Sequence, residues 1–370
     1  MSEPRAAGIT LAGVTKTFPG SRSPAVSPLD LEVPAGEVVV LIGPSGCGKT
    51  TTLRMINRLI EPTAGTISIE GVDIRTRPAT ELRRGIGYVI QQVGLFPHRT
   101  IAQNIATVPK MLGWDRARIR ARVDELADLV SLDESFLGRY PSELSGGQQQ
   151  RVGVARARAA DPPVLLMDEP FGAVDPIVRA RLQEELGNLQ ERVRKTIVLV
   201  THDIDEAITV GDRIAILNVG GVLEQYGKPD DLLAHPTNEF VESFLGAERS
   251  LKRLTLARVA DLDLRGGPVV AADASPAEAR EVMDREATSW IGVIREDRFL
   301  GWVPREALNG QRTVGEIDAA PPAAQVRPES TLREALEVIM TSRSSAAVVA
   351  DGDRFGGVVT LERIREGLGS

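Results

Sequence analysis

A glycine-rich loop constrains this chain more than any other feature of its sequence. The loop matches the full pattern G-x-x-x-x-G-K-[ST], with the residues Gly43, Pro44, Ser45, Gly46, Cys47, Gly48, Lys49 and Thr50. It follows the short apolar run Val38–Ile42, which is typical of a buried strand, and a helical pattern comes after it. Glycine lets the backbone approach phosphate oxygens closely, and amides at a helix start favour negative charge. The sequence therefore predicts a strand–loop–helix unit that holds the phosphates of a nucleotide.

The side chains at the end of this loop have separate predicted roles. We expect the Lys49 ammonium to reach the β- and γ-phosphates, and the Thr50 hydroxyl to hold Mg²⁺. Thr51 can add a contact to the α-phosphate. Cys47 fills a position where the pattern accepts any residue, so we interpret it as a small tolerated side chain in preference to a redox group.

A pair of acidic residues supplies the second half of the predicted site. The apolar run 164–167 ends in Asp168 and Glu169, which begin 118 residues after Thr50. An aspartate at the end of a buried strand can hold a Mg²⁺-bound water beside the nucleotide. The adjacent glutamate can orient or deprotonate the attacking water. We therefore expect Asp168 to act at the metal and Glu169 to act as the base.

Short apolar runs alternate with helical patterns through the first two thirds of the chain. Strands are predicted at 9–18, 38–42, 86–90, 164–167, 196–201 and 214–217, and helices at 116–132, 146–158 and 177–194. Buried strands that alternate with helices indicate an α/β fold with a largely parallel sheet. The pair Gly220 and Gly221, between two apolar runs, predicts a late hairpin.

Length, charge and cysteine content limit the function. The 370 residues suit two domains, one of them large. A formal net charge of -7 gives no general electrostatic case for binding nucleic acid. Cys47 is the only cysteine, which excludes an internal disulfide and favours a reducing compartment. The longest apolar runs are far shorter than the roughly 20 residues that span a bilayer, so any membrane role must come through a partner.

The last third of the chain contains an internal repeat. A shift of 56 residues aligns Glu278 with Glu334, Val293 with Val349, and Gly301 with Gly357 without a gap. Each copy predicts an extended segment, a helix, two short strands and a second helix. We therefore expect three parts: a large domain at 1–246, a linker at 247–256, and an α+β pair of repeats at 257–370.

The segment Leu144, Ser145, Gly146, Gly147 and Gln148 resembles the signature motif of ABC ATPases. In that family the motif contacts the γ-phosphate of ATP held by the opposite subunit, so the resemblance implies a homodimer with ATP between its subunits. It also implies a mixed sheet with a helical subdomain.

Other motifs of the family fall in the expected order. Gln91 matches the glutamine that senses Mg²⁺ and the attacking water. Asp175, in the segment 172–175, matches the loop that connects the two sites of the dimer, and His202 matches the switch histidine at the γ-phosphate. Phe18 stands where the family places an aromatic ring on adenine, although tyrosine is commoner there. The alternative for Phe18 is a core residue at a strand end.

Three segments indicate which group of ABC transporters the chain resembles most. Residues 89–98, 148–150 and 167–177 are similar to the importers of quaternary amines such as glycine betaine, carnitine and choline. The resemblance implies an ATPase subunit on the cytoplasmic face of the plasma membrane, working with permease subunits and a substrate-binding protein. Residues 93–97 would then receive the permease. The alternatives are an importer for another solute (an amino acid, polyamine or thiolated betaine), a soluble ABC ATPase without a transport role, and a purely regulatory nucleotide-binding module.

The repeat resembles a tandem pair of CBS modules, which that group of importers often carries. Such pairs bind adenine nucleotides through a hydroxyl and an acidic residue, positions that Thr360 and Glu362 occupy in the second copy. The first copy has Pro304 in place of the hydroxyl. The resemblance implies an effector, cyclic di-AMP or an adenine nucleotide, or a response to ionic strength. We expect Trp290 and Trp302 to pack in a core or interface, in preference to stacking on a base. Our hypothesis is that this tail dimerises and regulates the ATPase.

Overall fold

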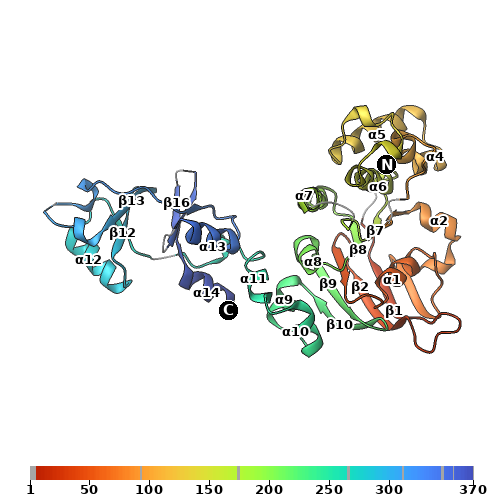
Figure 1. The fold of residues 1–370 in the computed structure, drawn as a ribbon, viewed down its shortest axis with the longest axis horizontal. Helices are drawn as coiled ribbons and strands as arrows, with labels where there is room; N and C mark the ends of the chain where they lie inside the picture. Colours follow the sequence, from red (N-terminus) through yellow and green to blue (C-terminus); the bar gives the residue numbers. More distant parts are fainter. Residues whose placement is uncertain are drawn as a thin grey trace. The chain divides into compact units, whose positions relative to one another are not determined.

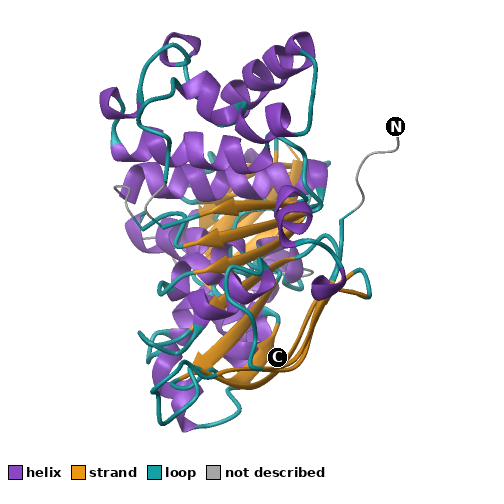
Figure 2. Cartoon of the chain, turned by 90° about the vertical axis from the view of Figure 1, so that its right-hand side faces the viewer, coloured by secondary structure: helices purple, strands orange, loops and turns teal. Residues whose placement is uncertain are grey.

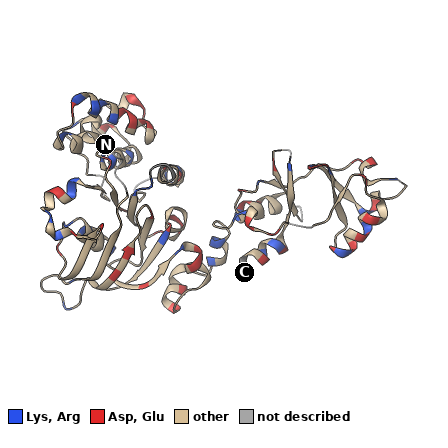
Figure 3. Cartoon of the chain, turned by 180° about the vertical axis from the view of Figure 1, so that it is seen from behind, with Lys and Arg blue, Asp and Glu red and all other residues tan. Residues whose placement is uncertain are grey.

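The chain forms two compact units, Met1–Gly246 and Ala247–Ser370, in a computed structural model (Figure 1). The structure describes residues 6–91, 94–172, 176–264, 267–310, 312–342, 346–352 and 354–369. Within these ranges no helix combines the length and the apolar character needed to cross a bilayer. Lysine and arginine are interspersed with aspartate and glutamate along the helices of both units (Figure 3).

Two sheets form the centre of the first unit. Their strands are β1 (Ile9–Lys16), β2 (Val26–Val33), β3 (Val38–Ile42), β4 (Ala64–Ile69), β5 (Val72–Asp73), β6 (Ile86–Val89), β7 (Val164–Asp168), β8 (Thr196–Val200), β9 (Arg213–Asn218) and β10 (Val222–Gly227). The smaller sheet has the order β2-β1-β4-β5, and the larger has the order β10-β9-β3-β8-β7-β6. In the larger sheet every neighbouring pair is parallel except β9 and β10. The predicted α/β class is therefore confirmed, as is the hairpin at Gly220 and Gly221.

Three central strands explain why this sheet is parallel. Every residue of β3, β7 and β8 is buried, so these strands are covered on both faces. Continuous apolar runs are typical of such strands because the crossover helices lie on both sides of the sheet. Helices do lie on both sides of the strands in Figure 2. Parallel strands place their carboxyl ends at one edge, so the loops after β3, β6, β7 and β8 meet there.

The helices of the first unit include a group with a core of its own. The helices of the whole unit are α1 (Lys49–Ile56), α2 (Ala79–Arg84), α3 (Ile101–Ile105), α4 (Thr107–Met111), α5 (Arg116–Leu129), α6 (Gly146–Arg158), α7 (Pro176–Val193), α8 (Ile204–Val210), α9 (Pro229–Ala234) and α10 (Glu239–Leu245), with 3-10 turns η1 (Ile74–Thr76), η2 (Glu134–Phe136) and η3 (Pro141–Glu143). Ile101, Ile105, Leu126 and Val152 are buried together where α3, α5 and α6 pack. Helices α3 to α6 thus form a helical subdomain, which lies at one end of the unit in Figure 1.

The second unit repeats one structure twice. Its elements are α11 (Arg249–Arg253), η4 (Val259–Asp261), β11 (Val269–Ala271), α12 (Pro276–Arg285), β12 (Trp290–Arg295), β13 (Arg298–Pro304), η5 (Arg305–Ala307), η6 (Val314–Glu316), β14 (Gln325–Val326), α13 (Leu332–Thr341), β15 (Ala346–Asp351), β16 (Arg354–Thr360) and α14 (Leu361–Gly369). Each copy is a three-stranded sheet, β11-β12-β13 or β14-β15-β16, with one parallel and one antiparallel pair. Helices α12 and α13 both begin with a capping box, Ser275 with Glu278 and Thr331 with Glu334.

The first copy departs from the predicted pattern at its second helix. The second copy ends in the α-helix α14, but the equivalent segment of the first copy is the single 3-10 turn η5. The prediction of a full second helix in the first copy was therefore wrong. Gly310 has φ +85° and stands where the 56-residue shift places Glu366 inside α14. A glycine in this conformation ends a helix, so the first copy cannot extend its turn.

The two copies exchange their leading segments. The segment before β11 bonds to the second copy, because the Val259 amide donates to the Ser330 carbonyl at 2.9 Å. The segment before β14 bonds to the first copy, because the Gly315 amide donates to the Ala272 carbonyl at 2.7 Å. Leu254, inside the segment predicted as a linker, is buried in the core of the second copy. This reciprocal packing makes the pair one structural unit.

Gly357 offers a test of how strictly the repeat depends on glycine. It has φ +141°, and a Cβ atom there would lie 2.8 Å from the Cβ of Leu264. We expect Gly357→Ala to destabilise the chain by about 1–3 kcal/mol, because the backbone is strained for any other residue. Chemical denaturation followed by the fluorescence of Trp290 and Trp302 measures this. Gly356→Ala is the matched control, since its Cβ would come no closer than 3.4 Å to a neighbour. Equal unfolding midpoints for the two variants would contradict the argument.

Candidate nucleotide-binding site

The order of the larger sheet gathers the predicted site residues at one edge. Strands β6, β7, β8 and β3 are neighbours, and each is followed by a predicted functional segment. Gln91 lies after β6, Asp168 and Glu169 at the end of β7, and His202 after β8. The glycine-rich loop follows β3 and leads into α1. The pocket at this edge is lined by residues 45–51 together with Ala25, Glu169 and His202.

The backbone of the loop requires its glycines. Gly43, Gly46 and Gly48 have φ values of +149°, +80° and +92°. A Cβ atom on Gly43 would lie 2.0 Å from the carbonyl oxygen of Leu217, on the neighbouring strand β9. Another residue type at this position would therefore push the loop away from the sheet.

Lys49 is held in place by the loop itself. Its side chain is buried, and the ammonium donates to the carbonyls of Gly43 at 2.7 Å and Pro44 at 3.1 Å. The thiol of Cys47 lies 3.5 Å from the same nitrogen and is fully buried. A cation fixed in this way is preorganised for phosphate oxygens. Cys47 packs in the core beneath the loop, in agreement with its interpretation as a small tolerated side chain.

Thr50 and Asp168 form the part of the site that suits Mg²⁺. The Thr50 hydroxyl donates to Asp168 Oδ1 at 2.9 Å, and Asp168 is buried at the end of β7. Mg²⁺ prefers oxygen ligands and takes only one or two from the protein when phosphates supply others. Thr50 and Asp168 supply two oxygen donors of this kind side by side. Gln91, which was also expected at the metal, donates its amide N–H to Glu169, and its role at the metal stays a prediction.

The environment of Asp168 predicts a pH-dependent effect on stability. Burial raises the pKa of its carboxyl group, against the opposing effects of the Thr50 hydrogen bond and the Arg54 charge. The ionised form is thus less favourable in the folded state than in the unfolded state. This penalty grows as pH rises above the ordinary pKa of aspartate, and it is complete above the raised pKa.

We therefore expect Asp168→Asn to raise the thermal unfolding midpoint of the nucleotide-free protein at about pH 8, while it removes Mg²⁺-dependent ATP hydrolysis. Asparagine still accepts the Thr50 hydrogen bond. The stabilisation should shrink as pH falls towards the ordinary pKa of aspartate. A midpoint difference that grows towards acid pH would contradict the assigned cause. Asp205→Asn, on the surface of α8, serves as the control.

Glu169 is positioned by its backbone and by two side chains. It has φ +46°, and its amide donates to the Val200 carbonyl of β8 at 2.9 Å. Gln91 Nε2 donates to Glu169 Oε2 at 2.6 Å, and His202 Nδ1 lies 3.3 Å from Glu169 Oε1. A non-glycine residue held in the left-handed region is typical of functional sites. Gln91 and His202, the other two residues predicted to be catalytic, thus both contact Glu169, which lines the pocket of the phosphate loop.

The predicted signature residues lie elsewhere in the unit. Ser145 is the N-cap of α6: its hydroxyl accepts from the Gln148 amide, and Gln148 Oε1 accepts from the Ser145 amide at 2.9 Å. Ser145 and Gly146 are exposed, and Gly147 is half-buried. Of the described residues that line the pocket of the phosphate loop, none belongs to this segment. The chain therefore presents Ser145, Gly146, Gly147 and Gln148 at its surface, away from its own loop.

The remaining predicted residues have mixed outcomes. Phe18 lies beyond the end of β1 and is 38% exposed, which excludes the alternative of a core residue. Asp175 and Val93 lie outside the described residues. In the second unit, the Thr360 hydroxyl accepts from the Arg363 amide at 3.3 Å and so caps α14, while Glu362 is exposed.

Trp290 and Trp302 pack edge-on at 4.5 Å between ring centroids. Phe299 lies 4.8 Å from Trp302 and stacks on Phe355 of the other copy at 5.5 Å. Both tryptophans are half-buried, and the cluster joins the two copies. This arrangement agrees with the interpretation of the tryptophans as packing residues.

Sequence reasoning missed a group of charged residues next to His202. Asp203 caps α8 by accepting from the amides of Asp205 and Glu206, and Arg179 of α7 pairs with both Asp203 and Glu206. The spacing D-x-x-E after His202 is a helix-start pattern and would have predicted the cap. No pattern marked Arg179, because its partners are 24 and 27 residues away.

The fold and the site define a phosphate-loop ATPase with its catalytic groups on the carboxyl edge of a parallel sheet. Residues 26–172 match the family model described as ABC transporter, and residues 314–370 match the CBS domain. An osmoprotectant import ATP-binding protein of Salmonella typhimurium is 49% identical over 98% of this chain and 96% of its own length. A glycine betaine/carnitine/choline transport ATP-binding protein of Bacillus subtilis is 46% identical over 95% and 94%.

A solved structure agrees with this assignment. The dimeric structure of a bacterial ABC transporter cassette superposes with a TM-score of 0.55 and 37% identity, covering 60% of this chain and 98% of that one. The chain belongs to the family of ABC transporter ATP-binding subunits that includes these osmoprotectant, glycine betaine, carnitine and choline proteins.

Proposed function

We propose that this protein is the ATP-hydrolysing subunit of an ABC importer for quaternary-amine osmoprotectants such as glycine betaine, carnitine and choline. The observation that carries the proposal is the contact of Glu169 with Gln91 and His202, beside a loop in which Lys49 is already fixed. Together they place a base, a phosphate cation and two polar sensors at one edge of the sheet. The relatives that match nearly the whole chain are named for transport of these solutes.

The chemistry follows from these positions. Lys49 and the loop amides bind the β- and γ-phosphates, and Thr50 with Asp168 would hold Mg²⁺, which neutralises phosphate charge. Glu169 orients or deprotonates the attacking water, and His202 and Gln91 fix its carboxylate. Phe18 offers an exposed ring face to adenine, with the Lys16 ammonium 5.2 Å from its centroid.

We propose that two copies bind ATP between them. The helix start at Ser145 is exposed. It does not line the described pocket of the phosphate loop in the same chain, so it is available to contact a second copy. The similar cassette forms a dimer. ATP then stabilises the closed dimer, and hydrolysis releases it.

The partners follow from the function. The dimer would bind two permease subunits on the cytoplasmic face of the membrane, and a substrate-binding protein would select the solute. Solute choice lies in those partners, so the test is to identify the solutes that the partner binding protein retains. A binding protein selective for amino acids or polyamines would favour the alternative importer. Recovery of the ATPase with membranes only when the permease is present separates a transporter subunit from a soluble ATPase.

The second unit is proposed to regulate the ATPase, with an adenine nucleotide or cyclic di-AMP as the effector. The reciprocal packing of its two copies supports a cooperative module, and residues 314–370 match the CBS domain. Thermal unfolding of the isolated unit with each nucleotide tests binding. Removal of residues 251–370 tests regulation, and unchanged transport and salt response in that variant would contradict it.

A further inference from the structure

The turn that carries His202 is closed by its own hydrogen bonds. The Thr201 hydroxyl donates to Glu206 Oε2 at 2.5 Å and accepts from the Asp203 amide at 3.0 Å. Asp203 Oδ1 in turn accepts from the amides of Asp205 at 2.8 Å and Glu206 at 3.2 Å. His202 lies between Thr201 and Asp203, so its backbone moves only if this whole turn moves.

One side chain from another helix reaches this turn. Arg179 of α7 places Nη1 3.5 Å from Asp203 Oδ2 and Nε 3.6 Å from Glu206 Oε1. Glu206 is buried, and a buried carboxylate depends on a nearby cation because it has lost its hydration. Arg179 therefore ties α7 to the acidic residues that hold the turn of His202.

The distances from Arg179 to Asp203 and Glu206 are both longer than a good hydrogen bond. The Nε atom of Arg179 is buried, and at 3.6 Å from Glu206 it makes no hydrogen bond. A small displacement of α7 towards α8 would shorten both ion pairs. The distance between His202 and Glu169, now 3.3 Å, would change with the same displacement.

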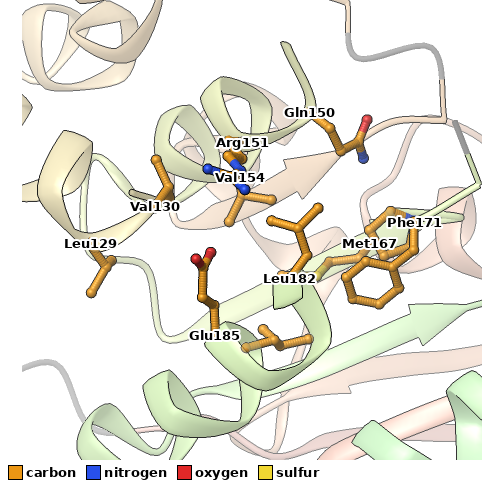
Figure 4. A pocket seen from close by; sticks show the side chains of 11 residues that line it. Leu129, Val130, Gln150, Arg151, Val154, Met167, Phe171, Leu182 and Glu185 are labelled. Atoms are coloured by element: carbon orange, nitrogen blue, oxygen red, sulfur yellow. The ribbon is translucent and has the colours of Figure 1, made fainter. Parts of the chain in front are cut away.

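About one turn beyond Arg179, helix α7 borders a pocket. The pocket separates Leu182 of α7 from Val154 of α6, and Figure 4 shows these side chains facing each other across it. Gln150 of α6 also lines this pocket, and its buried amide has no hydrogen-bond partner among the residues that the structure describes. Incomplete packing allows neighbouring helices to shift against each other as rigid bodies. Helix α7 thus lies between α6, which begins at the signature segment, and the turn of His202.

We propose that Arg179 is a positioning residue, which couples the placement of α7 to the position of His202 against Glu169. It is not among the described residues that line the pocket of the phosphate loop, and it acts through Asp203 and Glu206. The inference rests on the proposed ATP hydrolysis. A wild-type protein without ATPase activity would contradict the proposed function. The role of Arg179 is tested by differences between variants of an active enzyme.

The first test is Arg179→Ala in the full chain, assayed by steady-state phosphate release. We expect kcat to fall on the order of tenfold, because small misplacements at a reacting centre are costly. KM for ATP should stay within about twofold, since Arg179 does not contact the phosphate loop. Arg179→Lys, which retains a cation, should recover part of the loss. Arg181→Ala is the matched control: it removes an exposed arginine of the same helix that pairs with Glu185.

A second measurement separates positioning from folding. Glu206→Gln retains an acceptor for Thr201 but loses the pairing charge, so kcat should also fall. Combined with Arg179→Ala it should cost no more than the larger single change, because both remove one contact. Additive losses in the double variant would overturn the proposal. A normal kcat in the Arg179→Ala protein would also overturn it. The same holds if the loss of kcat is accompanied by a lower unfolding midpoint and Arg179→Lys restores neither.

Discussion

Replacement of Glu169 by glutamine is expected to lower the rate of ATP hydrolysis by about 10²–10⁴-fold, the usual contribution of a general base. Glutamine has nearly the same shape and can still accept the hydrogen bond from Gln91 Nε2, which is 2.6 Å long in the wild type. It cannot take a proton from water. ATP binding should persist, because Lys49 and the loop are unchanged, and phosphate release at saturating ATP measures the loss.

The same variant should accumulate as an ATP-bound dimer, because the proposed dimer opens only after hydrolysis. Size-exclusion chromatography with and without ATP would detect the shift. Glu184→Gln, an exposed glutamate of α7, is the control and should hydrolyse normally. A Glu169→Gln protein that turns over ATP at the wild-type rate would show that another group activates the water.

The sequence predicted the nucleotide site well because each of its parts follows a buried strand. Apolar runs are easy to recognise, and parallel strands bring their ends together, so Lys49, Asp168 and Glu169 had to meet. Ends of elements were less predictable. The predicted helix 116–132 ends at Leu129, because Ser131 takes φ +50°, and no residue type in that segment announced this turn.

Long-range contacts explain what could not be predicted. The exchange of leading segments between the two copies of the repeat joins Val259 to Ser330, 71 residues away, through backbone groups that carry no sequence signal. Arg179 likewise pairs with Asp203 and Glu206 through tertiary packing of α7 on α8. The contact of Gln91 with Glu169 was also not evident from the sequence, because the two residues are 78 positions apart.

Replacement of Lys49 by alanine is expected to abolish use of the nucleotide at the binding step, which distinguishes it from the Glu169 variant. Hydrogen bonds to charged groups contribute about 1.5–3 kcal/mol each. Loss of the contacts to two phosphates therefore weakens ATP binding by about 10²–10⁴-fold. Titration calorimetry with ATP measures the affinity, and phosphate release should be undetectable.

The fold should survive the Lys49 change, because the partners of the ammonium among the described residues are the loop carbonyls of Gly43 and Pro44 and the thiol of Cys47. The glycine conformations that shape the loop do not depend on it. Lys110→Ala, at an exposed position of α4, controls for the loss of one positive charge. If Lys49→Ala bound ATP as tightly as the wild type, the phosphates would lie elsewhere. Glu169 and His202 line the pocket of this loop, so their proposed catalytic roles would then lose their support as well.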